Sequence, residues 1–184
     1  FALDASAQTS LTLYIGYAAS EGIDNSTTNS SAKVDSGASF AAAFDYGLDP
    51  SRQLQFFYSQ QNTQLAPGGT LAPFDFTVRY LHIGGTSFVN GPIGEGIYVV
   101  GGLGATQMSP SLDGLDSEIK PSLNLGIGFQ WPIAANLAVR AEARAFFTLI
   151  NSSGNLFCSG GCVATLKGDA FVQGTAMVGL SGRF

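Results

Sequence analysis

The single histidine of this sequence is the residue type best suited to acid or base catalysis near neutral pH. His82 lies within residues 80–85, ahead of a predicted short turn. Catalysis would require a nucleophile or a carboxylate within hydrogen-bond reach of the ring. The alternation of the surrounding segment points His82 to the outer surface of the fold, where we identify no such partner. We therefore predict no catalytic residue, and a chain that is not an enzyme.

The two cysteines are close enough in sequence to react with each other. Cys158 and Cys162 bracket Ser159-Gly160-Gly161, and such a tight, flexible turn can close a local disulfide in an oxidising compartment. A zinc site would need further ligands nearby, and His82 lies far away in the sequence. The spacing therefore predicts a disulfide between Cys158 and Cys162, with no metal site and no cofactor.

Charged residues on the polar faces of the predicted strands form the other chemical group. Arg140, Glu142 and Arg144 are spaced two residues apart, about 7 Å from one to the next by strand rise. We expect Glu142 to bridge both arginines and Arg79 to reach it across the interior. Positive and negative charges balance, which favours mutual pairing over a binding site for one sign of charge. The predicted interior ion-pair network comprises Asp45, Asp75, Arg79, Arg140, Glu142 and Arg144.

Eight segments alternate between an apolar and a small or polar residue, the period of a β-strand. No long segment repeats its apolar residues at helical spacing, and glycine is frequent inside the segments. In the fourth segment, Phe74, Phe76, Val78 and Tyr80 form the apolar face. The fifth segment is rich in glycine and valine, so its register stays open. The segments span about residues 11–18, 39–48, 53–59, 74–80, 97–108, 123–131, 139–149 and 172–184.

The connections alternate in length along the chain. Polar and mostly long connections span Ile23–Lys33, Ala66–Ala72, Ser109–Ser117 and Asn151–Lys167. Short turns lie at residues 48–52, 90–92 and 132–136, where proline, asparagine, aspartate and glycine favour reversal of the chain. Long loops at one end and short turns at the other predict an antiparallel up-and-down barrel.

Composition decides between a soluble and a membrane barrel. Apolar residues make up 45% of the chain and charged residues only 11%, yet no stretch approaches the roughly 20 apolar residues of a membrane-spanning helix. Charges inside and apolar faces in lipid account for both facts, whereas a soluble β-sandwich is the weaker alternative. We expect Tyr14, Phe57, Arg79, Glu142 and Arg144 to fill the interior. Expected interfacial aromatics are Tyr17, Tyr46, Tyr80, Trp131 and Phe184.

The sequence thus predicts an all-β fold, an eight-stranded antiparallel up-and-down transmembrane β-barrel, as one domain over residues 1–184. The net charge is −5 and the Lys and Arg residues are dispersed, so we expect no nucleic-acid partner.

Two short stretches resemble a known family. The end of the chain, Gly179-Leu180-Ser181-Gly182-Arg183-Phe184, resembles the last strand of outer-membrane barrels, although Gly182 stands where that signal usually has an aromatic. Residues 136–144 resemble the penultimate hairpin of the small eight-stranded bacterial outer-membrane barrels, which include the transmembrane domain of outer-membrane protein A. The resemblance implies an assembly signal at Phe184, Leu180 and Val178, read by the barrel-assembly machinery.

The same resemblance implies a place in the bacterial outer membrane, with periplasmic termini, extracellular long loops, and lipid and lipopolysaccharide as surroundings. Three functions follow in order of preference. The first is a structural or interaction barrel with a filled interior and no open pore, with an unknown membrane-protein partner possible. The second is a narrow conduit or binding protein for small or apolar molecules. The third is a lipid A-modifying enzyme, of which small membrane barrels offer precedents.

Overall fold

The computed structural model describes residues 8–20, 23–25, 30–66, 73–111, 116–150, 155–158, 162–165 and 170–184, and side chains within most of these ranges. None of the described residues forms a helix long and apolar enough to cross a membrane. The described residues form β-strands joined by turns. The strands are β1 Thr9–Ser20, β2 Ile23–Asn25, β3 Ser30–Val34, β4 Gly37–Gly47, β5 Arg52–Ala66, β6 Phe74–Phe88, β7 Gly96–Pro110, β8 Glu118–Ala134, β9 Leu137–Leu149, β10 Asn155–Cys158, β11 Cys162–Thr165 and β12 Ala170–Arg183.

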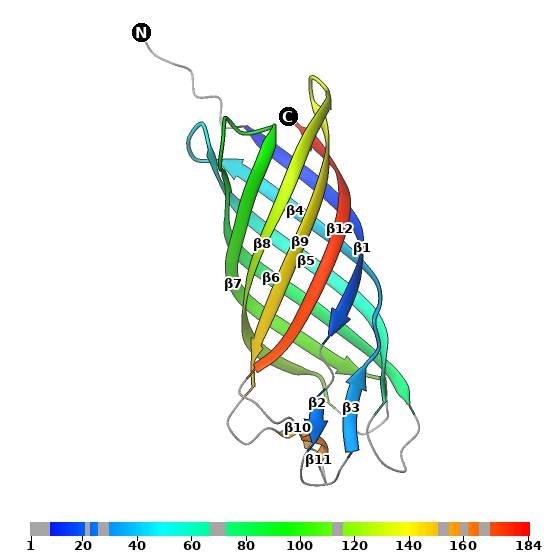
Figure 1. The fold of residues 1–184 in the computed structure, drawn as a ribbon. Helices are drawn as coiled ribbons and strands as arrows, with labels where there is room; N and C mark the ends of the chain where they lie inside the picture. Colours follow the sequence, from blue (N-terminus) through cyan, green and yellow to red (C-terminus); the bar gives the residue numbers. More distant parts are fainter. Residues whose placement is uncertain are drawn as a thin grey trace.

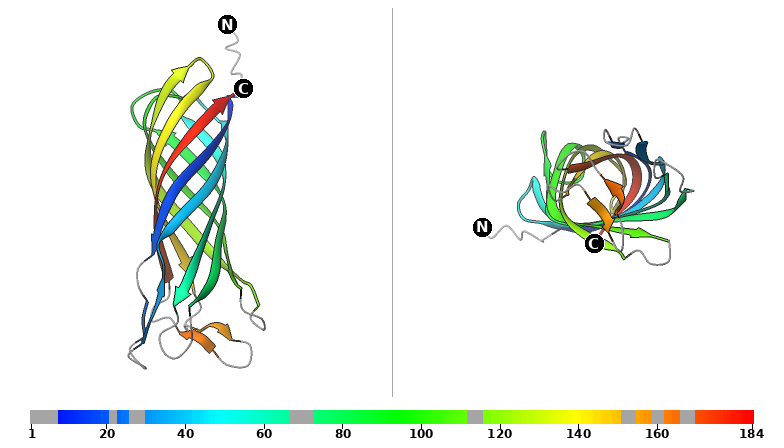
Figure 2. Two further views of the ribbon diagram at one scale, coloured as in Figure 1. Left: turned by 90° about the vertical axis from the view of Figure 1, so that its right-hand side faces the viewer. Right: turned by 90° about the horizontal axis from the view of Figure 1, so that it is seen from below.

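Eight of these strands close into an antiparallel barrel. Each neighbouring pair in the order β5, β4, β1, β12, β9, β8, β7, β6 is hydrogen-bonded, and β5 pairs with β6 to complete the ring. The strands tilt strongly across the barrel axis, and the end-on view shows the ring (Figures 1 and 2). The predicted fold class is therefore confirmed: a closed, eight-stranded, all-antiparallel β-barrel.

The two ends of the barrel differ. The start of β1 and the end of β12 lie at one end, which we call the terminal end, with the short turns at residues 48–51, 89–95 and 135–136. The short strands β2, β3, β10 and β11 lie at the opposite end, which we call the loop end (Figure 1). β3 continues beyond β4 and pairs with the end of β5, Lys33 with Ala66 and Val34 with Leu65. Gly94 in the turn after β6 and Gly96 at the start of β7 have φ angles that other residues rarely adopt, 122° and 97°.

Alternate residues of each strand point into the barrel and are buried, whereas the others are exposed on its outside. On β1, for example, Leu13 and Ile15 are 61% and 67% exposed while Tyr14 is 2% exposed. The open register of β7 is settled by the same criterion, since Tyr98 and Val100 point inward and Leu103 outward. The apolar exterior is what the composition requires of a barrel surrounded by lipid.

β6 is the strand whose predicted orientation is wrong. Phe74, Phe76, Val78 and Tyr80 are buried inside the barrel. The apolar residues change parity along this strand. Up to Tyr80 they occupy the even positions, and beyond it they occupy the odd positions, where Leu81 and Ile83 are 65% and 49% exposed on the outside. In a regular strand all odd residues share one face and all even residues share the other. Because Leu81 and Ile83 face the lipid, the even residues of β6 point inward.

The change of parity also corrects the expected aromatic belt. Tyr80 lies inside the barrel and is not interfacial. The other four residues of the predicted set are exposed on the outside: Tyr17, Tyr46, Trp131 and Phe184.

The turn between β4 and β5 is held by one carboxylate. Asp49 Oδ1 accepts hydrogen bonds from the backbone N–H groups of Ser51 at 2.9 Å and Arg52 at 2.8 Å, and its other oxygen pairs with the Arg52 side chain. The Ser51 backbone N–H and the Arg52 guanidinium lower the pKa of Asp49 from 3.8 to about 2.

Candidate functional site

The interior of the barrel holds two buried ion pairs, both formed by predicted residues. The first joins Arg140 on β9 to Asp45 on β4, with Nη1 2.7 Å from Oδ2 and both side chains at most 1% exposed. Arg140 Nε also donates to Gln130 Oε1 at 2.7 Å. This pair lies toward the end of the barrel that carries the termini, since Asp45 is two residues from the end of β4.

The second ion pair lies within β9. Arg144 Nη2 is 2.7 Å from Glu142 Oε1, again with both side chains at most 1% exposed. The other oxygen of Glu142 accepts hydrogen bonds from the hydroxyls of Tyr98 at 2.9 Å and Tyr14 at 3.3 Å. The Arg144 guanidinium stacks 3.7 Å above the centre of the Phe57 ring. Both charges of this pair are thus hydrogen-bonded as well as paired, which offsets their burial.

Gln55 on β5 connects the two ion pairs. Its amide nitrogen donates to Asp45 Oδ1 at 2.8 Å, and its oxygen accepts from Arg144 Nη2 at 2.9 Å. The expected bridge was Glu142, but Arg140 takes its carboxylate from another strand, so that expectation is corrected. Gln55 was not among the predicted network residues, although the alternation places it on the inner face of β5, two residues before the buried Phe57.

Two predicted members of the network lie on the outside of the barrel. Asp75 and Arg79 share their face with Leu81, so the change of parity along β6 carries them outward. Asp75 accepts a hydrogen bond from Gln64 at 3.2 Å, and Arg79 donates to Gln60 at 3.2 Å. Neither residue contacts the interior pairs, and Arg79 cannot reach Glu142 across the barrel.

His82 is buried inside the barrel, at 2% exposed, and does not face lipid as predicted. Its Nε2 lies 2.8 Å from Ser122 Oγ, a contact across β7 that the sequence did not indicate. The strand between them carries Gly104, where an added Cβ would lie 2.7 Å from the His82 ring. Among the described residues Nδ1 has no hydrogen-bond partner, so this histidine and serine lack the carboxylate of a catalytic triad.

Aromatic rings stack on the loop-end side of the ion pairs. The ring centres of Tyr80 and Phe146 are 4.1 Å apart, and those of Phe146 and His82 are 5.7 Å apart. Phe57 stacks against Phe146 at 6.0 Å. Charged pairs with their carboxamides and this aromatic cluster therefore occupy successive levels of the interior.

The family of the chain follows from comparison with known proteins. The model of the outer membrane protein beta-barrel domain matches residues 1–184. The chain belongs to this family. No curated protein matches it.

Solved structures of outer-membrane barrels share its fold. Neisserial surface protein A has a TM-score of 0.65 and 12% identity, with 96% of this chain and 97% of that chain covered. OprG of Pseudomonas aeruginosa has a TM-score of 0.60 and 13% identity, with 97% of this chain and 96% of that chain covered. Ail, the attachment invasion locus protein of Yersinia pestis, has a TM-score of 0.51 and 23% identity, with 97% of this chain and 99% of that chain covered. These likenesses show the same small-barrel fold, and the family match supports a place in the bacterial outer membrane.

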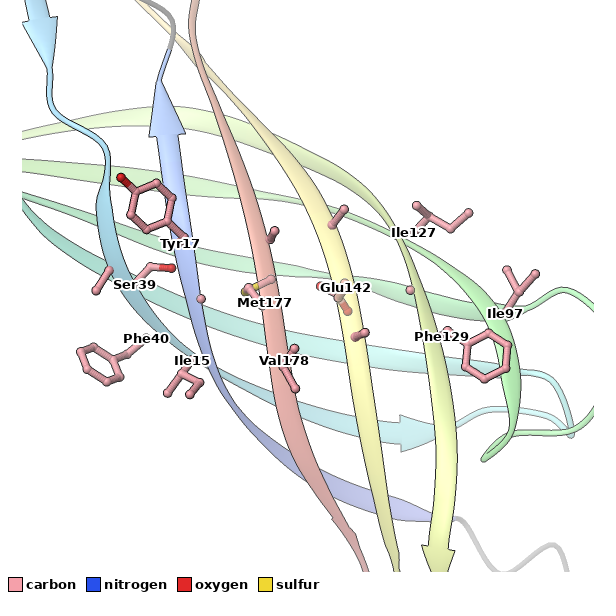
Figure 3. Close-up of a pocket in the computed structure, with 16 residues that line it drawn as sticks. Ile15, Tyr17, Ser39, Phe40, Ile97, Ile127, Phe129, Glu142, Met177 and Val178 are labelled. Carbon is pink, nitrogen blue, oxygen red and sulfur yellow. The ribbon is translucent and has the colours of Figure 1, made fainter.

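The outer surface of the family barrel is hollowed on one side. A groove of about 1030 Å³ lies over β12 and β9, and small residues that include Ala141, Ala143 and Ala176 line it. Larger side chains border it, Tyr17 and Phe40 on one side and Ile97, Ile127 and Phe129 on the other (Figure 3). In contrast, a void between Arg140 and the turn residues Ile93 and Asn136 measures only about 10 Å³, about the smallest space that holds a water molecule.

The predicted disulfide gains no support. The backbone places Cys158 directly opposite Cys162 in the ladder between β10 and β11. Their side chains lie outside what the structure describes, so the bond stays a prediction. Of the predicted assembly signal, Val178, Leu180 and Phe184 share the outer face at the terminal end and are 54%, 49% and 73% exposed.

Proposed function

We propose that this protein is an integral outer-membrane barrel with a structural or interaction role, whose interior is filled by side chains and does not form an open pore. The observation that carries the proposal is the connection from Arg140 through Asp45 and Gln55 to Arg144 and Glu142. These residues come from β4, β5 and β9 and so meet across the interior. An eight-stranded barrel has an interior just wide enough for side chains to fill it.

Planar-bilayer recording tests the filled interior. The wild-type protein is expected to give no steady conductance above leak. The double variant Glu142→Ala with Arg144→Ala removes both charges of one pair without changing the net charge, and is expected to raise conductance because water replaces the removed side chains. Steady conductance of the wild type would instead support the conduit for small molecules.

We also propose that the termini face the periplasm and the loop end faces the exterior, where the interaction role would lie. The names of two structural neighbours, a surface protein and an attachment protein, fit this arrangement. The test is labelling of intact cells with a membrane-impermeant maleimide, in a background with Cys158 and Cys162 replaced by serine. Ser117→Cys is expected to react and Ala135→Cys to react only after the membrane is opened.

The absence of enzymatic activity is part of the same proposal. It is supported by the position of His82, whose described partner is Ser122 and not a carboxylate. Replacement of His82 by Ala is expected to leave the lipid A composition of the membrane unchanged. Loss of an acyl-chain modification in that variant, measured by mass spectrometry of lipid A, would support the alternative that the protein is a lipid A-modifying enzyme.

A further inference from the structure

The outer face of β5, β6 and β7 changes from apolar to polar toward the loop end. The change occurs between one outward-facing row of residues and the next. On the apolar side Phe56, Leu81 and Leu103 are 46%, 65% and 67% exposed. Toward the loop end the outward positions become polar, and we call this set the outer polar patch. It consists of Gln60, Asn62, Gln64, Asp75, Thr77, Arg79 and Gln107. Such a change in polarity marks the level at which the hydrocarbon of the membrane ends.

Arg79 lies in the first row of this patch. Its direct partners in the two ladders are Gln60 on β5 and Gln107 on β7. Its Nε donates to Gln60 Oε1 at 3.2 Å, and Nη1 donates to Gln107 Oε1 at 3.4 Å. Gln60 is itself held, because its oxygen also accepts from Tyr58 at 2.8 Å and its nitrogen donates to Asn62 at 3.1 Å. The guanidinium is therefore oriented by neutral groups that use only part of its donors.

The protein does not neutralise the charge of Arg79 within the part of the chain that the structure describes. The described ion pairs leave it out, and Asp75, on the same face, accepts its hydrogen bond from Gln64. An unpaired charge at the edge of hydrocarbon is costly, and an anion from outside the chain would stabilise it. Phosphate suits the planar, many-donor guanidinium.

We propose that the outer polar patch binds the headgroup of a phosphorylated glycolipid of the outer leaflet, with Arg79 on a phosphate. The surrounding carboxamides, together with Asp75 and Thr77, supply donors and acceptors for sugar hydroxyls. The inference rests on the proposed orientation of the barrel, because only the loop end then reaches the outer leaflet. The outer polar patch lies beside the last apolar row of the outer face. A lipid whose headgroup binds the patch would therefore place its acyl chains against Leu81 and Leu103.

Native mass spectrometry of the folded protein in detergent micelles tests the site directly and independently of orientation. The protein is titrated with lipid A that carries its phosphates, with dephosphorylated lipid A and with phosphatidylglycerol. Binding of phosphorylated lipid A is expected to be tightest. Arg79→Gln is expected to weaken it by about tenfold or more, as loss of a hydrogen bond to a charged group implies.

Arg52→Gln is the matched control, because Arg52 is an exposed arginine at the opposite end of the barrel. It should bind as the wild type does. A boiling-dependent gel shift in each variant shows that it is folded, so a lost complex reports on the site. Equal binding of dephosphorylated lipid A, displacement by inorganic phosphate alone, or unchanged binding by Arg79→Gln would each overturn the proposal.

Discussion

Glu142 illustrates how a single buried residue depends on its surroundings. It pairs with Arg144 and also accepts hydrogen bonds from the hydroxyls of Tyr14 and Tyr98. Asp75 was assigned to the same network by its sequence, yet it is exposed on the outside with Gln64 as its partner. The two carboxylates should therefore differ widely in their contribution to stability.

We predict that Glu142→Ala lowers the free energy of unfolding by about 3–5 kcal/mol, because it leaves Arg144 charged and unpaired inside the barrel. Asp75→Ala is the control and should change stability by less than about 0.5 kcal/mol, as surface substitutions usually do. Urea unfolding in micelles, followed by the gel shift, measures both. Similar losses in the two variants would contradict the assigned faces of β6 and β9.

Asp49 makes the turn between β4 and β5 sensitive to acid. Its pKa in the folded protein is about 2, below the ordinary 3.8, first because of the Ser51 backbone N–H and then because of the Arg52 side chain. A lowered pKa means that the stabilisation is complete above the ordinary value and is lost as pH falls toward the folded value. We predict that hydrogen exchange at the Ser51 and Arg52 amides, corrected for intrinsic rates, accelerates between about pH 4 and pH 2. In Asp49→Asn this acceleration should be absent, and its persistence would point to another group.

At the scale of strands, the glycines of β7 decide which side chains fit inside the barrel. A Cβ at Gly104 would collide with the Leu81 carbonyl oxygen and lie 2.7 Å from the His82 ring. On β12, a Cβ at Gly174 would meet only the Ala19 carbonyl oxygen at 3.9 Å, an ordinary contact. The absence of a side chain at Gly104 is therefore what lets His82 reach Ser122.

We predict that Gly104→Ala lowers the free energy of unfolding by about 1–3 kcal/mol, the usual cost of overpacking. Gly174→Ala should be tolerated within about 0.5 kcal/mol. Thermal unfolding in micelles compares the two, and NMR of the His82 ring reports whether its contact with Ser122 is lost. Equal stability of both variants would show that β6 and β7 can separate at this point without loss.

The hairpin of β10 and β11 carries the prediction for the cysteines. Because Cys158 and Cys162 are direct partners in the ladder, the backbone brings them together without the aid of a disulfide. We predict a disulfide in the exported protein, with a stabilisation of about 2 kcal/mol since the closed loop is short. Alkylation under denaturing conditions should modify neither residue before reduction and both after it. Modification without reduction would show free thiols.

At the scale of the whole molecule, closure of the barrel pairs each of its eight strands on both sides. The pairing of β5 with β6 completes the ring, so each barrel strand has a hydrogen-bonded neighbour on both sides. Without an edge, detergent cannot compete for backbone hydrogen bonds one strand at a time. Resistance to detergent is thus a property of the closed ring and not of one element.

We predict that the unheated protein migrates differently from the boiled protein on a detergent gel. The unheated form should retain a β-type circular dichroism spectrum in the same detergent. A single band at both temperatures, together with a helical spectrum, would contradict the fold.

The sequence determined the strand number, the antiparallel order and the membrane environment. Each follows from local alternation, from the alternation of long and short connections, or from composition, and none requires knowledge of which residues meet. The inner and outer faces of six of the eight barrel strands were readable for the same reason. Glycine and valine left the face of β7 open, and the face predicted for β6 was wrong. Burial of Arg140, Glu142 and Arg144 on one face of β9 was likewise predicted.

Only the tertiary structure decided the partners and the orientation of β6. Its apolar residues change parity at Tyr80, and the neighbours β5 and β7 fix which half sets the face. That choice moved His82 inward and moved Asp75 and Arg79 outward. Gln55 and Ser122 joined their partners because barrel closure and the missing side chain of Gly104 bring distant strands within hydrogen-bond reach. Alternation along one strand specifies two faces, but the side that meets lipid and the residues across the interior depend on how all eight strands close.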